Sequence, residues 1–144
     1  MKSLRPHVWK RLRSERGVAA LEFAIVSQLL LLLLYGMLMY GFVFALDHNM
    51  TQAAAEGARA AISQTTNIAT YAQNAARDRL SFGQAKTYAN VTASVAACPS
   101  DATVQCVTVT ITYDNATHPV LPGFFGMQYL APSTISATST VELD

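Results

Sequence analysis

The chain has 144 residues, of which 51% are hydrophobic and 13% are charged. This length leaves room for one membrane segment and one small domain, which excludes a large multidomain enzyme. The net charge of +1 averages two unlike parts, because residues 1–17 hold six of the ten lysines and arginines, whereas residues 18–144 hold eight of the nine acids. This asymmetry is typical of the positive-inside pattern of membrane proteins and argues against a nucleic-acid partner.

Residues 23–46 form a stretch of 24 residues without a charged side chain. A helix needs about 20 mainly apolar residues to cross a bilayer, so the stretch predicts a single membrane-spanning helix. The basic residues that flank it lie only on its N-terminal side. We therefore expect the N-terminus to stay cytoplasmic and everything after Leu46 to lie on the other side of the membrane.

A secretory signal peptide is the alternative interpretation of the same region. A basic segment, an apolar segment and the alanines at 53–55 imitate its three parts. The apolar part of a signal peptide is shorter, about 7–15 residues, which favours a permanent anchor. Cleavage after Ala55 would leave a chain that begins at Glu56.

A short motif, GVAALEF at residues 17–23, lies where the basic leader meets the apolar stretch. An acid within a membrane helix costs up to about 2.5–3.5 kcal/mol at the bilayer centre and less near the surface. Glu22 therefore either marks the edge of the membrane or meets a positive partner. An amino group released by a cut nearby is the obvious candidate for that partner.

The motif resembles the cleavage site of type IV prepilins, in which a glycine precedes the scissile bond and a glutamate stands fifth in the mature chain. Residues 16–63, and AEGAR at 55–59 in particular, are similar to the TadE-like family, pseudopilins of tight-adherence (Flp-type) pilus systems. One departure is Gln28, where the family often carries proline. It does not touch the cleavage motif.

The resemblance implies that a prepilin peptidase cuts between Gly17 and Val18, and that Glu22 and Phe23 belong to the processing and assembly motif. The Val18 amine would then offer a positive partner to Glu22 of a neighbouring subunit. Four residues carry the family motif beyond the membrane: Glu56, Gly57, Ala58 and Arg59. The implied partners are the peptidase, other pilin-like subunits and the assembly platform, and the implied location is the bacterial inner membrane, with the C-terminal domain in the periplasm.

The residues just beyond the membrane stretch keep a helical character. Apolar residues recur at a spacing of four: Met50, Ala54, Ala58 and Ile62. A glycine inside a helix is unfavourable, so Gly57 suggests close approach of another helix. Glu56 and Arg59 are three apart, a spacing at which they can form an ion pair.

A second helix is predicted after Asn67, as its N-cap, and before Gly83. The period then changes to two, which predicts strands at 107–113 and, with weaker alternation, around 88–97 and 135–143. The predicted fold is α+β: a long N-terminal pilin-like helix that continues outside the membrane, a second short helix and a small three-stranded antiparallel sheet. The expected organisation is a leader at 1–17, a transmembrane helix at 18–46, a helical region at 47–83 and a sheet domain at 84–144.

Cys98 and Cys106 lie beyond the membrane stretch, where disulfides persist, and flank the loop between the first two strands. A disulfide would close this short loop and contribute about 2–3 kcal/mol. A redox-active pair is the alternative, although no nearby cation or helix start would lower a thiol pKa. The two cysteines and three histidines show no metal-ligand spacing, so we expect no metal and no cofactor.

A loop rich in proline and aromatic residues is expected at 118–132, with Phe124, Phe125 and Tyr129. It either folds over the edge of the sheet or offers a contact surface to another subunit. Asn90 and Asn115 begin glycosylation sequons, a pattern that is common by chance.

Together these observations favour a minor pilin-like subunit that acts by assembly rather than by catalysis. The sequence holds no G-x-S-x-G, H-E-x-x-H or S-x-x-K motif and no phosphate-binding glycine loop, and its acids beyond the membrane are scattered. An uncleaved single-pass scaffold of an envelope complex is the alternative. A major pilin fits less well, because Flp-type major pilins are much shorter.

Overall fold

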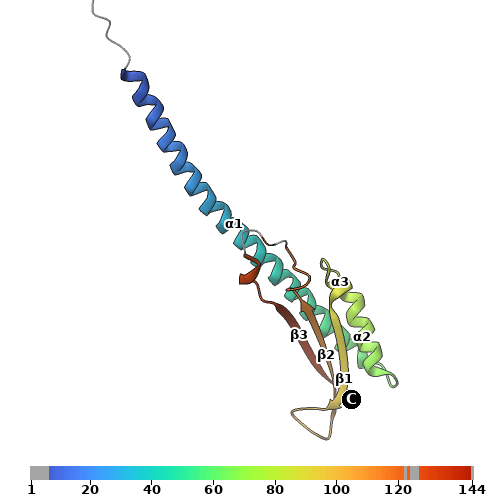
Figure 1. The fold of residues 1–144 in the computed structure, drawn as a ribbon. Coiled ribbons are helices and arrows are strands. Elements are labelled where there is room, and N and C mark those ends of the chain that lie inside the picture. The colour runs from blue at the N-terminus through green and yellow to red at the C-terminus, as the bar shows by residue number, and fades with distance from the viewer. Residues whose placement is uncertain (1–6, 122, 124–126, 144) are drawn as a thin grey trace, which may run out of the picture. The chain divides into compact units, whose positions relative to one another are not determined.

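The structure is a computed structural model that describes residues 7–121, 123 and 127–143, with side chains described for residues 17–121, 123 and 129–143. The chain divides into two compact units, Met1–Leu38 and Met39–Asp144. The elements follow in this order (Figure 1): α1 (His7–Ala61), α2 (Ile68–Arg79), α3 (Ala85–Tyr88), β1 (Asn90–Ala97), β2 (Gln105–Asp114), the 3-10 helix η1 (Met127–Leu130) and β3 (Thr134–Leu143).

The apolar part of α1 in the first unit is not covered by any part of the chain that the structure describes. Each of the six leucines at 29–34 is 47–66% exposed. The helix contains a segment near the N-terminus that is long and apolar enough to cross a membrane. A helix that exposes leucines on every side is unfavourable in water, so this segment needs lipid or partner helices around it.

The second unit contains a three-stranded antiparallel sheet in the order β1-β2-β3, as predicted. The central strand β2 pairs with both neighbours, so that Val107 faces Val95 on β1 and Val141 on β3. Alternate side chains of β2 are buried, as the period of two predicts: Val107, Val109, Ile111 and Tyr113.

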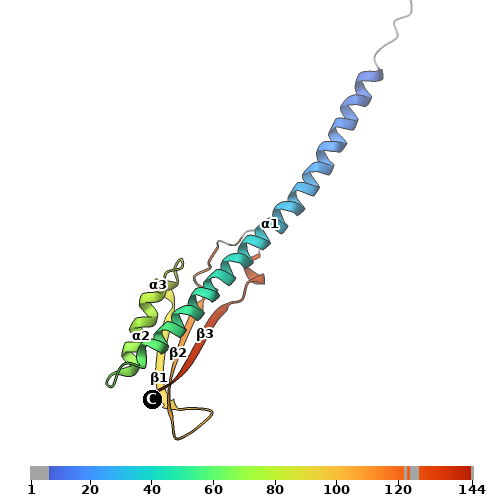
Figure 2. The same cartoon turned by 180° about the vertical axis from the view of Figure 1, so that it is seen from behind.

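The residues of α1 from 39 to 61 and helix α2 cover one face of this sheet, and Figures 1 and 2 show the sheet from its two sides. The core between helices and sheet is built from small side chains on the helices and branched ones on the strands. Met50, Ala54 and Ala58 are buried on α1, as their spacing predicts. The side-chain amide of Gln73 on α2 donates to the carbonyl of Val91 on β1, which ties the helix to the sheet edge.

The other face of the sheet carries hydroxyl side chains in aligned rows. Thr108 pairs with Thr140 across the β2–β3 ladder, with 3.0 Å between their hydroxyl oxygens, and Thr110 and Thr138 repeat the pairing at 3.3 Å. These polar rows explain why β2 alternates so regularly, since one face packs on the helices and the other meets solvent.

Three details differ from the sequence-based expectations. Helix α1 ends at Ala61, so Ile62 lies in the following turn and is exposed. Asn67 precedes α2 in a left-handed conformation (φ 54°) and makes no side-chain cap hydrogen bond. The short helix α3 was not predicted, because four residues are too few to show a helical period.

Candidate functional site

The cleavage motif predicted at residues 17–23 lies within α1, in the exposed part of the first unit. Val18, Glu22 and Phe23 all have exposed side chains, and a Cβ added at Gly17 would meet no atom within 4 Å. No packing among the described residues therefore opposes access to the Gly17–Val18 bond. A glycine also costs about 1 kcal/mol in a helix relative to alanine, which favours local unwinding at this bond.

Val18 and Glu22 are one helical turn apart, so they lie on the same face of α1. A cut at Gly17 would place a new amino group and the Glu22 carboxylate about 6 Å apart along the helix. Such a helix end presents one positive and one negative group to neighbouring helices. In apolar surroundings their attraction is far stronger than in water.

The family motif at residues 56–59 lies where α1 packs against α2. A Cβ added at Gly57 would come within 2.6 Å of the Ala76 Cβ and 2.8 Å of the Ala72 carbonyl oxygen. The neighbouring Ala58 is fully buried. The close approach of α2 thus requires glycine at position 57, as the sequence suggested, whereas Ala58 belongs to the buried core.

The two charged residues of the motif, Glu56 and Arg59, are exposed. Together with Arg79 of α2 they line a polar cleft of about 560 Å³. Glu56 and Arg59 form no ion pair with any residue that the structure describes, so the pairing that their spacing permits is not made. Both charges are left available to water or to a partner.

Asn49 joins α1 to the end of α2 at the other side of this cleft. Its Oδ1 accepts hydrogen bonds from the backbone N–H groups of Ser81 and Phe82, both at 3.3 Å, and its Nδ2 donates to the Ser81 hydroxyl at 3.3 Å. These bonds fix the turn that follows α2. No local sequence signal identifies Asn49, because its partners lie more than thirty residues further along the chain.

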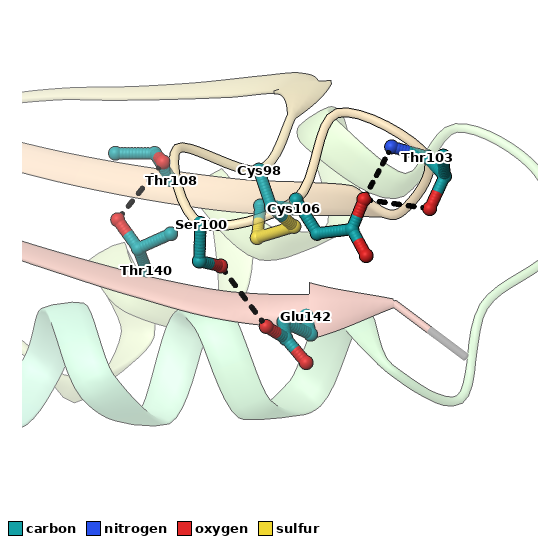
Figure 3. The surroundings of a disulfide bond; sticks show 8 residues. Cys98, Ser100, Thr103, Cys106, Thr108, Thr140 and Glu142 are labelled. Carbon is teal, nitrogen blue, oxygen red and sulfur yellow. Dashed lines mark hydrogen bonds between the residues drawn. A yellow bond between two sulfur atoms is a disulfide. The ribbon is translucent and has the colours of Figure 1, made fainter.

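Cys98 and Cys106 form the expected disulfide at the loop end of the β1–β2 hairpin, with 4.9 Å between their Cα atoms (Figure 3). Within the loop that it closes, Asp101 Oδ1 accepts hydrogen bonds from the backbone N–H and the hydroxyl of Thr103, at 2.9 and 2.7 Å. The Thr103 hydroxyl, followed by its N–H, lowers the pKa of the Asp101 carboxyl. Glu142 lies beside the two sulfurs, but bonded sulfurs offer no thiolate to a metal.

The turn after β2 is held by two neighbouring side chains. The Asp114 carboxylate accepts hydrogen bonds from Thr117 and from the N–H of Ala116, and these bonds, that of the Thr117 hydroxyl first, lower its pKa. Asn115 is buried and has both ends bonded, donating to the Pro132 carbonyl and accepting from the Val120 N–H, each at 3.0 Å. Its amide is therefore committed to the fold and unsuited to glycosylation.

Tyr113 supports the same turn from within the core. Its hydroxyl donates to the carbonyl of His118 at 2.6 Å, and the His118 ring stacks on Tyr88 with 3.7 Å between ring centroids. Burial raises the pKa of the Tyr113 hydroxyl. In the loop expected at 118–132, Phe124 and Phe125 lie outside the described residues, whereas the Tyr129 side chain is 85% exposed.

The comparisons with known proteins bear on the first part of the chain. Residues 17–59 match the family model of TadE-like proteins, as the motifs predict. The comparison with curated proteins gave no significant match, and neither did the comparison with solved structures.

Proposed function

Because residues 17–59 match the TadE-like family, we propose that the chain is a minor pseudopilin of a tight-adherence, Flp-type pilus system. A prepilin peptidase cuts it between Gly17 and Val18, and the mature chain takes part in pilus assembly through protein contacts rather than catalysis. The observation that carries this proposal is the extent of the match. It begins at Gly17, the residue before the proposed cut, and ends at Arg59, the last residue of the motif that receives α2.

The exposed part of α1 supports an assembly role. Its leucines are not covered by any described residue, so other pilin-like helices can pack along them when the subunit assembles with its neighbours. The α2 contact at Gly57 holds the C-terminal end of the same helix against the sheet domain. The subunit thus presents an apolar helix for packing and a folded domain for contacts with partners outside the membrane. We place that domain in the periplasm and the leader in the cytoplasm.

The fold argues against a signal peptide that ends at Ala55. Cleavage there would remove six buried residues: Met39, Val43, Leu46, Met50, Ala53 and Ala54. The domain would lose the helix face that covers its sheet. An anchor that remains part of the folded chain is compatible with this packing.

The test is the N-terminal sequence of the protein recovered from membranes, with and without a prepilin peptidase. We expect a start at Val18 only when the peptidase is present. A Gly17→Val variant should stay uncut, because a branched side chain replaces the glycine at the scissile bond. Gly41→Val is the matched control, since a Cβ added at either glycine meets nothing within 4 Å.

An intact N-terminus in the presence of the peptidase would contradict the proposal and favour the uncleaved envelope scaffold. A start at Glu56 would contradict both and indicate a signal peptide. Cleavage of Gly17→Val at the rate of Gly41→Val would show that the peptidase does not recognise this site.

A further inference from the structure

Exposed apolar side chains lie near the first residues of α1 that belong to the second unit, which begins at Met39. Phe44 on α1 is 68% exposed, and Tyr129 and Leu130 on η1 are 85% and 64% exposed. The two elements are joined by a hydrogen bond of 3.1 Å from the Tyr40 hydroxyl to the Leu130 carbonyl. We call Tyr40, Phe44, Tyr129 and Leu130 the apolar rim.

The packing of the neighbouring residues distinguishes the rim from the core. Met39 and Val43 are buried in the domain, and Phe42 packs against Phe82 with 6.1 Å between ring centroids. Tyr40 and Phe44 instead pack against each other, with 6.5 Å between ring centroids, and remain exposed. The rim is therefore an apolar surface that the described chain does not cover.

The position of the rim along the sequence indicates what covers it. A membrane helix needs about 20 residues to cross the hydrocarbon, and counted from Phe23 such a span ends near Phe42. Domain packing already begins at Met39, and no charged side chain occurs between Glu22 and Asp47. The domain thus begins near the end of the predicted membrane span. Leu130 of η1, which accepts the hydrogen bond from Tyr40, lies beside this part of α1.

We propose that the apolar rim rests in the headgroup region of the lipid bilayer, so that η1 forms a second membrane contact beside α1. Tyrosine suits this region, since its ring is apolar and its hydroxyl polar, and tyrosines are enriched where membranes meet water. The bond from Tyr40 also satisfies a carbonyl that would otherwise enter a poorly hydrated layer. The proposal rests on the membrane anchoring in the proposed function but not on cleavage of the leader.

The test places single tryptophans in the full chain, reconstituted in zwitterionic phospholipid vesicles that carry bromine either near the headgroups or at the bilayer centre. Trp9→Phe removes the native tryptophan. Tyr129→Trp probes the rim and Leu32→Trp the middle of the apolar helix. Tyr71→Trp is the matched control, an exposed tyrosine at the start of α2, next to Ala72, which packs against Gly57 far beyond the rim on α1.

We expect bromine near the headgroups to quench the Tyr129→Trp emission at least about twofold more than that of Tyr71→Trp, as befits an interfacial aromatic residue. Bromine at the bilayer centre should quench Leu32→Trp most. If Leu32→Trp is quenched while Tyr129→Trp behaves like Tyr71→Trp, the rim proposal is overturned and the anchor stands. Absence of quenching at Leu32→Trp would overturn both. A rim tryptophan shielded from an aqueous quencher but insensitive to bromine would show that protein covers the rim, which also overturns the proposal.

Discussion

Gly57 is the residue at which the sequence motif and the packing meet most directly. A helix interior normally favours alanine over glycine by about 1 kcal/mol, so glycine is retained here against its own propensity. The atoms that a methyl group would meet are the Ala76 Cβ and the backbone of α2, neither of which can rotate away. The close contact between the helices therefore depends on the absence of one methyl group.

Gly57→Ala should lower the free energy of unfolding of the domain by about 1–2 kcal/mol, because overpacking costs about 1–3 kcal/mol and the better helix propensity returns part of it. Gly41→Ala is the control, since nothing lies within 4 Å of its added Cβ. Chemical unfolding of both full-length variants in detergent, followed by near-ultraviolet circular dichroism, measures the difference. Equal midpoints for the two variants would show that α2 does not approach α1 this closely.

Asp114 makes the turn after β2 sensitive to acid. Hydrogen bonds from Thr117 and Ala116 lower its pKa in the folded state, so at acidic pH the folded chain binds fewer protons at Asp114 than the unfolded chain does. Its contribution to stability is therefore present above the unfolded pKa, about 3.9, and is lost as the pH falls through the lower folded value. We expect the carboxyl carbon of Asp114 to titrate by NMR below the value in an unfolded peptide. Thr117→Val, which removes the hydroxyl, should bring the two closer, whereas an unchanged titration would contradict this assignment.

At the scale of elements, the disulfide links the two strands at the loop of the β1–β2 hairpin. Its two cysteines lie eight residues apart, next to the last and first residues that pair in the β1–β2 ladder. It cannot set the register, which the alternating apolar side chains of β2 already determine. Its contribution is to limit the freedom of the loop in the unfolded chain.

Replacing both cysteines with alanine should lower the free energy of unfolding by about 2–3 kcal/mol, the chain-entropy estimate for so short a loop. Amide hydrogen exchange should quicken in residues 98–106 and remain slow at Val109 and Ile111 in the middle of β2. Reduction of the wild-type protein is the matched comparison. Loss of protection along all of β2 would show that the sheet depends on the disulfide for its pairing.

The regular elements were predictable because their signals are local. The valines and the isoleucine of β2 alternate with threonines, and residues 23–46 carry no charged side chain. The remainder depends on distant partners. The roles of Asn49 and Asn115 follow from groups 32 and 17 residues away, and a left-handed Asn67 looks in sequence like an ordinary N-cap. The spacing of Glu56 and Arg59 permits an ion pair. An exposed ion pair contributes so little to stability, however, that spacing alone does not determine whether the pair forms.

At the scale of the whole molecule, the two units place opposite demands on their surroundings. Residues 39–144 bury a core of their own, whereas the leucines of residues 17–38 are uncovered. The family match spans both parts, from the exposed motif to the α2 contact. Glu22 is the residue whose role depends most on what the uncovered helix meets, because its carboxylate is exposed in the isolated chain.

Glu22→Gln separates the two interpretations of this acid. If Glu22 neutralises the Val18 amine of a neighbouring subunit, the variant should still be cut after Gly17 but should associate with pilin-like subunits at least about tenfold less. Breaking a buried ion pair costs about 3–5 kcal/mol, and 1.4 kcal/mol corresponds to a tenfold change in affinity.

Cross-linking in membranes, followed by recovery of the mature chain, measures the association. Glu56→Gln is the control, an exposed acid beyond the apolar stretch. If Glu22 only marks the membrane edge, glutamine is the cheaper residue in lipid, and association should stay equal or rise.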